Sequence, residues 1–164
     1  MISTDELDHV LHSILPSYQG TYALDQLPQN RLMRPSSLIC NTDVASLPGT
    51  HWMALCLPPQ HHLIYFIEPY DLALHKLLPP LYEWMKQYPS QIITLPYTLQ
   101  PLESKLCGAY CAFILSHLPK FHYNLNELVY QHFSSYDLNA NDKKVACWWE
   151  YISKHTTSQF HFSR

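Results

Sequence analysis

Apolar residues near the N-terminus share one helical face. They are Leu7, Val10, Leu11, Ile14 and Leu15, whose spacing follows the helical repeat. Ser3 followed by Glu6 matches a capping box, and Pro16 ends the pattern. The sequence therefore predicts a helix over residues 3–15 that packs on the core.

The middle of the chain contains short apolar stretches separated by turn residues, a pattern typical of strands. An irregular connection is expected over residues 16–36, with a short strand near Gly20–Tyr22. Further strands are predicted at Ser36–Thr42, 51–57, 63–67 and Gln91–Leu95. The strands 51–57 and 63–67 are joined by a short polar turn and form a hairpin. Antiparallel pairing brings the start of the first strand, His51, and the end of the second, Glu68, to one edge of the sheet.

The remaining apolar segments have helical character. Helices are predicted at Leu74–Tyr88, 107–118, Asn124–Phe133 and Asp142–Lys154. Strands clustered in mid-chain and flanked by helices favour an α+β fold, with a mostly antiparallel central sheet, over alternating βαβ units. A length of 164 residues is consistent with a single domain over 1–164.

Composition and charge narrow the function classes. The charged fraction is 14%, below the usual value of about 25%, and the net charge is −3. Strong DNA binding is therefore not expected, although the 11 histidines add positive charge below about pH 6.5. No segment has the features of a signal peptide or a bilayer span, so we expect no membrane association.

The 5 cysteines show no disulfide framework, which indicates a reducing, intracellular setting. Their spacing also lacks paired zinc ligands, so no metal site is expected. Cys40, Cys56, Cys111 and Cys147 are predicted to be buried structural thiols. The pair His61-His62 lies in the hairpin turn and is expected to be exposed. For the aromatic residues Trp148, Trp149, Phe160 and Phe162, core packing and a partner surface both remain open.

Cys107 is the main candidate for chemistry. A polar loop precedes the pair Cys107-Gly108, and an apolar helix follows. A helix N-terminus stabilises a thiolate, the nucleophilic form of cysteine. Gly108 keeps a Cβ away from the carbonyl under attack and is a candidate substrate-binding residue.

A cysteine nucleophile in acyl transfer also needs a base, a carboxylate that orients the base, and oxyanion donors. His51, Glu68, Gln100 and Cys107 supply these groups in chain order. The Cys107 N–H and the Gln100 amide would bind the oxyanion. Trp52 is predicted to form a substrate-binding platform beside the site, with plain core packing as the alternative.

Several motifs, in order from about residue 5 to residue 118, resemble the adenain family of adenovirus maturation proteases. They are Gly-Thr-His51-Trp52-Met-Ala, Phe-Ile-Glu68-Pro69-Tyr, Gln100 seven positions before Cys107-Gly108, Gly20-Thr-Tyr22 and Ile39-Cys-Asn41-Thr42. The resemblance implies a papain-like fold in permuted His-Glu-Gln-Cys order, shared with the SUMO-specific proteases.

The resemblance also implies roles for the candidate residues. His51 is the base and Cys107 is the nucleophile. Glu68 orients the base, with Asp71 as the alternative because the family uses either acid. Gln100 is the oxyanion donor.

The activity implied is that of a viral cysteine endopeptidase. It would cleave capsid and core precursors at glycine-containing sites during virion maturation, in the virion and the host nucleus. The family's best-known member is activated by DNA and by a viral peptide disulfide-linked to a cysteine. Ile92 stands at that cysteine's position here, and basic residues are few, so no cofactor is expected. We expect a monomer whose partners are its protein substrates.

Two other functions stay open at this point. A deubiquitinase or SUMO-type protease would use the same residues on ubiquitin-like proteins that end in Gly-Gly. A binding module that kept the fold without catalysis is the other alternative.

Overall fold

The structure is a computed structural model that describes residues 1–162, with side chains described as far as Thr156. Within this range the strands form one five-stranded sheet in the order β1-β2-β3-β4-β5. The strands are β1 (Tyr18–Tyr22), β2 (Ser36–Asn41), β3 (Trp52–Leu57), β4 (Leu63–Ile67) and β5 (Gln91–Ile93). The central strands β2, β3 and β4 are antiparallel, while β1 and β5 join the two edges in parallel. The predicted α+β fold with a central antiparallel sheet is confirmed.

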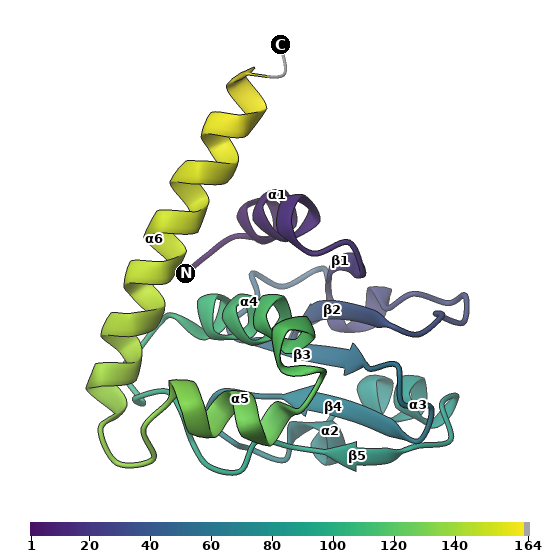
Figure 1. The fold of residues 1–164 in the computed structure, drawn as a ribbon. Coiled ribbons are helices and arrows are strands. Elements are labelled where there is room, and N and C mark those ends of the chain that lie inside the picture. Colours follow the sequence, from purple (N-terminus) through teal and green to yellow (C-terminus); the bar gives the residue numbers. More distant parts are fainter. Residues whose placement is uncertain (163–164) are drawn as a thin grey trace.

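Helices lie on both faces of the sheet and along its side (Figure 1). The α-helices are α1 (Thr4–Ile14), α2 (Leu74–Leu77), α3 (Pro79–Lys86), α4 (Cys107–His117), α5 (Leu125–His132) and α6 (Leu138–Phe162). Short 3-10 helices are η1 (Leu24–Gln26) and η2 (Leu118–Phe121). In Figure 1, α4 and α5 cover the front face of the sheet, α2 and α3 lie behind it, and α6 runs along one side.

The sequence signals of α1 and the strands have clear structural counterparts. The Ser3 hydroxyl accepts a hydrogen bond from the Glu6 N–H at 3.2 Å, and the Glu6 carboxylate accepts one from the Ser3 N–H at 2.7 Å. This is the predicted capping box. Along β3, Ala54 faces the core beneath α4, whereas Leu55 faces a second core on the α3 side. Both faces of the strand are therefore covered, and all its residues are buried.

Some predicted elements differ from the structure. The helix expected over Leu74–Tyr88 is two helices that meet at Leu78, whose φ of −111° and ψ of 98° are extended. Proline disfavours helical geometry in the residue before it, and Pro79 begins α3. The last helix begins four residues earlier than predicted, because the Asp137 carboxylate accepts a hydrogen bond from the Ala140 N–H at 3.0 Å.

The thiols are only partly as predicted. All five cysteines lie in the described part of the chain and are free. Cys40, Cys56 and Cys111 are buried, but Cys147 is exposed on α6, so its predicted burial is wrong. His61 and His62 are exposed, as predicted.

The aromatic residues of α6 pack on the domain where the structure describes them. Trp148 and Trp149 are partly buried against the core that contains α4. The Trp148 ring meets Phe113 edge-on, with ring centroids 5.2 Å apart. The side chains of Phe160 and Phe162 lie outside the described residues. No helix within residues 1–162 is both long and apolar enough to cross a bilayer.

Candidate active site

Three elements bring the predicted residues together at one edge of the sheet. His51 directly precedes β3, Glu68 directly follows β4, and Cys107 is the first residue of α4. The register that pairs Ala54 with Ile67 places the start of β3 beside the end of β4. The edge that the hairpin pattern predicted is therefore the edge at which α4 begins.

His51 and Glu68 form a buried pair. The His51 Nε2 contacts Glu68 Oε1, and the Glu68 side chain is 2% exposed. Backbone N–H groups hold the carboxylate from the other side: Tyr70 donates to Oε1 at 3.2 Å and Leu72 donates to Oε2 at 2.6 Å. Asp71, the alternative acid, is exposed and donates its backbone N–H to the Glu68 carbonyl at 2.8 Å. Glu68 is thus the acid that meets the imidazole.

Cys107 lies at the N-terminus of α4, beside the same imidazole. Its side chain is buried at 4% exposure, and the Trp52 N–H donates to Sγ at 3.4 Å. Because Nε2 of His51 is bonded to Glu68, Nδ1 is the ring nitrogen left to interact with the thiol. The positive end of the helix dipole at Cys107 favours a negative sulfur.

The environment of His51 favours the protonated imidazole. Burial lowers its pKa, but hydrogen bonding with Cys107 and Glu68 and the negative charges of both groups outweigh burial, and the pKa is raised to about 9. The imidazole is therefore protonated at neutral pH, as required for a group that later gives a proton to a leaving amine.

Tyr70 is a site residue that the sequence reasoning did not single out. Its ring stacks on His51, with centroids 5.1 Å apart and an interplanar angle of 27°. Its hydroxyl donates to the Ser104 carbonyl at 2.9 Å. Burial raises the Tyr70 pKa, and the charges of Cys107 and Glu68 add to this, so the phenol remains a hydrogen-bond donor. The only available signal was its place in the Glu68-Pro69-Tyr70 motif.

A cleft of about 370 Å³ opens beside the Cys107 thiol. Its walls come from the loop before β3, the loop after β4, the loop before α4 with the first residue of that helix, and Met1. The lining residues are Met1, Gly49, Thr50, His51, Tyr70, Ser104, Lys105 and Cys107. A peptide that enters this cleft reaches both the thiol and the imidazole.

Gln100 lies behind this wall, at 1% exposure. Its Nε2 donates to the Ser104 carbonyl at 3.0 Å, and its backbone N–H donates to the Pro69 carbonyl at 3.2 Å. An amide nitrogen carries two hydrogens, and this bond to the Ser104 carbonyl uses one of them. Its Oε1 is buried without a hydrogen-bond partner among the described residues.

Trp52 and Gly108 lie away from the cleft lining and pack on each other. Trp52 is 4% exposed and donates from Nε1 to the Ile2 carbonyl at 2.9 Å. A Cβ built on Gly108 would stand 2.9 Å from Trp52 Cδ1 and 3.5 Å from Leu7. Close packing against the indole thus explains the absence of a Cβ at position 108. Substrate contacts by Trp52 and Gly108 stay a prediction.

The Gly108→Ala variant is expected to lose stability. Overpacking a core costs about 1–3 kcal/mol, and the higher helix propensity of alanine returns about 1 kcal/mol. Urea unfolding should therefore show a lower midpoint than wild type. A midpoint equal to or above that of wild type would show that the Trp52 indole shifts to accommodate the added methyl group without lowering stability.

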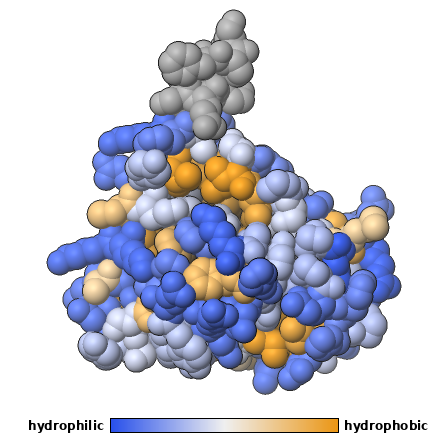
Figure 2. Space-filling model, viewed as in Figure 1, coloured by the Kyte–Doolittle hydropathy of each residue, from blue (hydrophilic) through white to orange (hydrophobic). Residues whose placement is uncertain are grey.

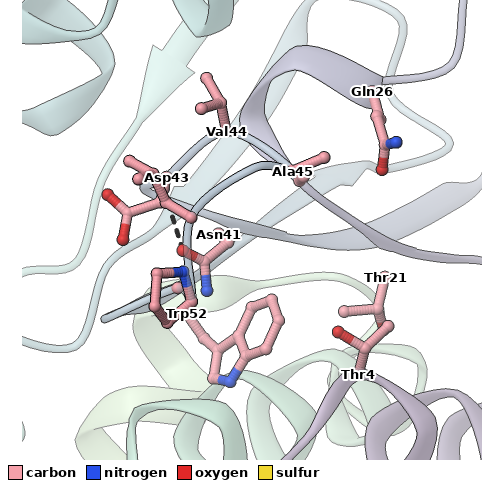
Figure 3. Close-up of a pocket in the computed structure, with 12 residues that line it drawn as sticks. Thr4, Thr21, Gln26, Asn41, Asp43, Val44, Ala45 and Trp52 are labelled. Carbon is pink, nitrogen blue, oxygen red and sulfur yellow. Dashed lines mark hydrogen bonds between the residues drawn. The ribbon is translucent and has the colours of Figure 1, made fainter.

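A second pocket, of about 210 Å³, lies next to the cleft and shares Gly49 with it. Figure 3 shows Thr4, Thr21 and Trp52 on one side and the Asn41–Ala45 segment on the other. The Asn41 side chain accepts the Asp43 N–H at 2.9 Å and so holds the loop before β3. Trp52 therefore lines this second pocket, which adjoins the cleft but is not lined by His51, Glu68 or Cys107.

Metal ligation finds no support in the described residues. Within that part of the chain no group of three or more His, Cys, Asp and Glu side chains is arranged to hold an ion. The site as built consists of a thiol, an imidazole, a carboxylate and an amide.

Comparisons with known proteins identify the fold. No protein-family model matches the sequence, and no curated protein sequence matches it. Among solved structures, the SUMO protease Ulp1 with its catalytic cysteine oxidized to a sulfinic acid aligns with a TM-score of 0.58 and 10% identity, over 96% of this chain and 78% of that one. The ASFV pS273R protease aligns with a TM-score of 0.52 and 11% identity, over 93% of this chain and 66% of that one. The chain therefore has the fold of the SUMO-protease-like cysteine proteases.

Proposed function

We propose that the chain is a cysteine endopeptidase. The observation that carries this proposal is the meeting of Cys107, His51 and Glu68 beside a cleft. The fold around them is the one found in two solved cysteine proteases. An orienting acid, a base and a thiol at a helix N-terminus are the parts that thiol-dependent acyl transfer requires.

In the proposed mechanism the Cys107 thiolate attacks the carbonyl carbon of the scissile peptide. The oxyanion accepts hydrogen bonds from the Cys107 N–H and from the free N–H of Gln100. Protonated His51 gives its proton to the leaving amine, while Glu68 stabilises the imidazolium and fixes its orientation. Water, activated by the then neutral His51, hydrolyses the thioester and regenerates the thiol.

The proposed substrates are proteins cleaved at glycine-containing sites. The cleft has a volume of about 370 Å³, and its lining includes Gly49, Thr50, Tyr70 and Ser104. The preference for glycine follows the resemblance to the adenain family. Following the resemblance to the adenain family, we propose capsid and core precursors of a virus as the natural substrates, processed in the virion and host nucleus.

We also propose that turnover needs no cofactor. The pairing of His51 with Glu68 and the contact of Cys107 with the Trp52 N–H form within one chain. The net charge of −3 gives no general attraction to DNA. Purified protein should cleave peptide at its full rate alone, and a manyfold increase on adding DNA or a viral peptide would refute cofactor independence.

A second candidate function is processing of ubiquitin-like proteins. It is favoured by the alignment with a SUMO protease at a TM-score of 0.58. A Gly-Gly terminus would suit the same cleft. A panel of ubiquitin-like vinyl sulfones separates the two functions: rapid labelling by one member supports the second, and labelling by none supports the first.

The reactivity of the Cys107 thiol distinguishes a peptidase from a non-catalytic binding module. The peptidase proposal predicts that iodoacetamide alkylates Cys107 at pH 6, because reactive cysteines are those beside a cationic imidazole at a helix N-terminus. A binding module predicts no such reaction.

The pH dependence follows from the raised pKa of His51. Turnover is expected to fall as pH rises through about 9, when the imidazole loses the proton that the leaving amine needs. Stability changes in the same direction as turnover, because the pKa of His51 in the folded protein exceeds its unfolded value of about 6.5. The stabilising contribution is therefore complete below about pH 6.5 and is lost as pH rises through about 9.

This dependence is measured by peptide turnover and urea unfolding at several values between pH 6 and pH 10. The Cys107→Ala variant is the control for stability, because it removes one of the partners that raise the His51 pKa. Because its folded pKa is lower, the variant should complete this loss of stability at lower pH than wild type, and should lose less stability between about pH 6.5 and about pH 9. A loss of wild-type turnover centred near pH 6.5 would contradict the imidazolium at this site.

The direct test of the function is a cleavage assay on Leu-X-Gly-Gly and Leu-X-Gly-X-Gly peptides. Cleavage after glycine by wild type, and none by Cys107→Ala of equal helix content, is the expected result. Absence of cleavage of both peptides and of all ubiquitin-like substrates would refute a peptidase.

A further inference from the structure

The loop before α4 is fastened to α6 at two points. Asn141 is 3% exposed, and its Nδ2 donates to the Leu99 carbonyl at 3.0 Å. The Asp142 Oδ1 accepts a hydrogen bond from the Ser104 hydroxyl at 2.9 Å. Two successive residues of α6 therefore hold the chain on both sides of Gln100.

The Ser104 carbonyl connects this fastening to the candidate site. It accepts hydrogen bonds from Gln100 Nε2 at 3.0 Å and from the Tyr70 hydroxyl at 2.9 Å. The Tyr70 ring in turn stacks on His51. One peptide carbonyl thus sets the position of the proposed oxyanion donor and of the ring that supports the base. Ser104 itself lines the cleft.

Asp142 also ties this loop to α4. Its Oδ1 accepts a second hydrogen bond, from the Tyr110 hydroxyl at 2.6 Å, and Tyr110 is fully buried. Burial raises the pKa of Tyr110, and the hydrogen bond to Asp142 adds to this, so the phenol stays protonated and donates. The Ser104 hydroxyl accepts the Leu106 N–H at 3.2 Å, directly before Cys107. The carboxylate therefore fixes the loop relative to the helix that carries the thiol.

We propose that Asp142 is a positioning residue for the peptidase reaction, which acts through Ser104 to hold the Gln100 amide where the oxyanion forms. The inference rests on the proposed function. Its physical basis is that an oxyanion donor must be placed before the reaction, and a displacement of about 1 Å costs about 100-fold in rate. Asp142 touches neither the cleft nor the reacting groups, so it is not a catalytic residue.

The test combines Asp142→Ala with a matched Asp142→Asn variant. The alanine variant loses the acceptor, and its kcat should fall by about 10-fold to 100-fold with little change in KM. The asparagine variant should keep most of the activity, because both hydrogen bonds converge on Oδ1 and an amide oxygen accepts them too. Alkylation of Cys107 by iodoacetamide needs no oxyanion donor, so its rate should stay at the wild-type value in both variants.

A double-mutant cycle with Gln100→Ala decides whether Asp142 acts through that amide. In the Gln100→Ala background the further change Asp142→Ala should have little effect on kcat. Tyr110→Phe is the control, because it removes the other bond to Asp142 and keeps the bond to Ser104. It should lower stability and leave kcat near wild type. If Asp142→Ala fails to fold, Ser104→Ala removes the hydrogen bond to Asp142 together with the one from the Leu106 N–H, keeps the carbonyl, and should show the same loss of kcat that vanishes in the Gln100→Ala background.

The outcomes separate this inference from the function on which it rests. An equal loss of kcat with and without Gln100, or a parallel slowing of alkylation, would overturn the positioning role while wild type remains active. Absence of cleavage by wild type would overturn the proposed function and the inference with it. Loss of kcat that vanishes in the Gln100→Ala background supports both.

Discussion

The Cys107→Ala variant is expected to cleave glycine-containing peptides no faster than background, a loss of at least about 10⁴-fold. The reason is that the covalent step uses the sulfur of Cys107, the one thiol among the residues that line the cleft. The thiol there lies beside a protonated imidazole and accepts the Trp52 N–H. Alanine removes the sulfur while the helix and its packing remain. The measurement is kcat/KM on the Leu-X-Gly-Gly peptide.

Cys111→Ala is the matched control for this prediction. Cys111 lies one turn along α4, is fully buried, and its thiol contacts the Trp52 carbonyl at 3.6 Å. The two cysteines therefore share a helix face and a neighbour, but only Cys107 lines the cleft. Turnover by Cys111→Ala should stay close to wild type. Substantial turnover by a folded Cys107→Ala variant would refute the nucleophile.

The Glu68→Gln variant is expected to lose between about 100-fold and about 10⁴-fold in kcat. Glutamine has nearly the same shape, but one of its terminal atoms is an amide group that donates hydrogen bonds. All three partners of the carboxylate, His51 Nε2 and the N–H groups of Tyr70 and Leu72, approach it as donors. The amide nitrogen must therefore face either the Leu72 N–H or the His51 and Tyr70 donors, and in both orientations the negative charge that stabilises the imidazolium is lost. Stability should fall as well, by about 1–3 kcal/mol.

The same variant has a second, independent readout. The charge of Glu68 is one of the causes that raise the His51 pKa to about 9. Its removal should lower that pKa, so any residual activity should be lost at lower pH than in wild type. Asp71→Asn serves as the control, because Asp71 is exposed and the His51 ring pairs with Glu68. If Asp71→Asn lost as much activity as Glu68→Gln, the orienting acid would have to be reassigned.

The geometry of the central hairpin was predictable because it depends on local pattern. Two apolar stretches with a short turn fix an antiparallel pair, and the residues at its open end must then be neighbours. His51 and Glu68 occupy those places, and their contact in the structure follows from the hairpin alone. The capping box of α1 was equally local, because Ser3 and Glu6 are three residues apart.

The parts that sequence reasoning missed depend on distant contacts. The bond between Ser104 and Asp142 spans 38 positions, and no periodicity relates the two residues. Tyr70 gains its place from the stacking on His51 and from the Ser104 carbonyl, which only the folded chain brings within reach. The contacts of the Trp52 indole with Gly108 and with the Ile2 carbonyl are also distant in sequence, and no local pattern indicates them.

The exposure of the Cys147 thiol on α6 could not be predicted from the sequence for a different reason. Cys147 follows the apolar residue Val145, which is fully buried, and composition alone favours burial of a cysteine. The face of the helix that meets the domain is set by its packing against α4 and α1, and Cys147 falls outside that face. Figure 2 shows one view of the resulting surface, on which hydrophilic side chains predominate and hydrophobic ones form small separate patches.

The role of Cys107 as the activated nucleophile is tested by identifying the residue that a substrate-like trap modifies. A peptide vinyl sulfone that ends in Gly-Gly is incubated with the protein, and intact mass and peptide mapping by mass spectrometry follow. We expect one adduct per chain, located on Cys107 and absent after His51→Ala. The exposed Cys147 provides an internal comparison for unassisted thiol reactivity. An adduct on Cys147 with Cys107 unmodified would contradict the assignment of Cys107 as the activated nucleophile.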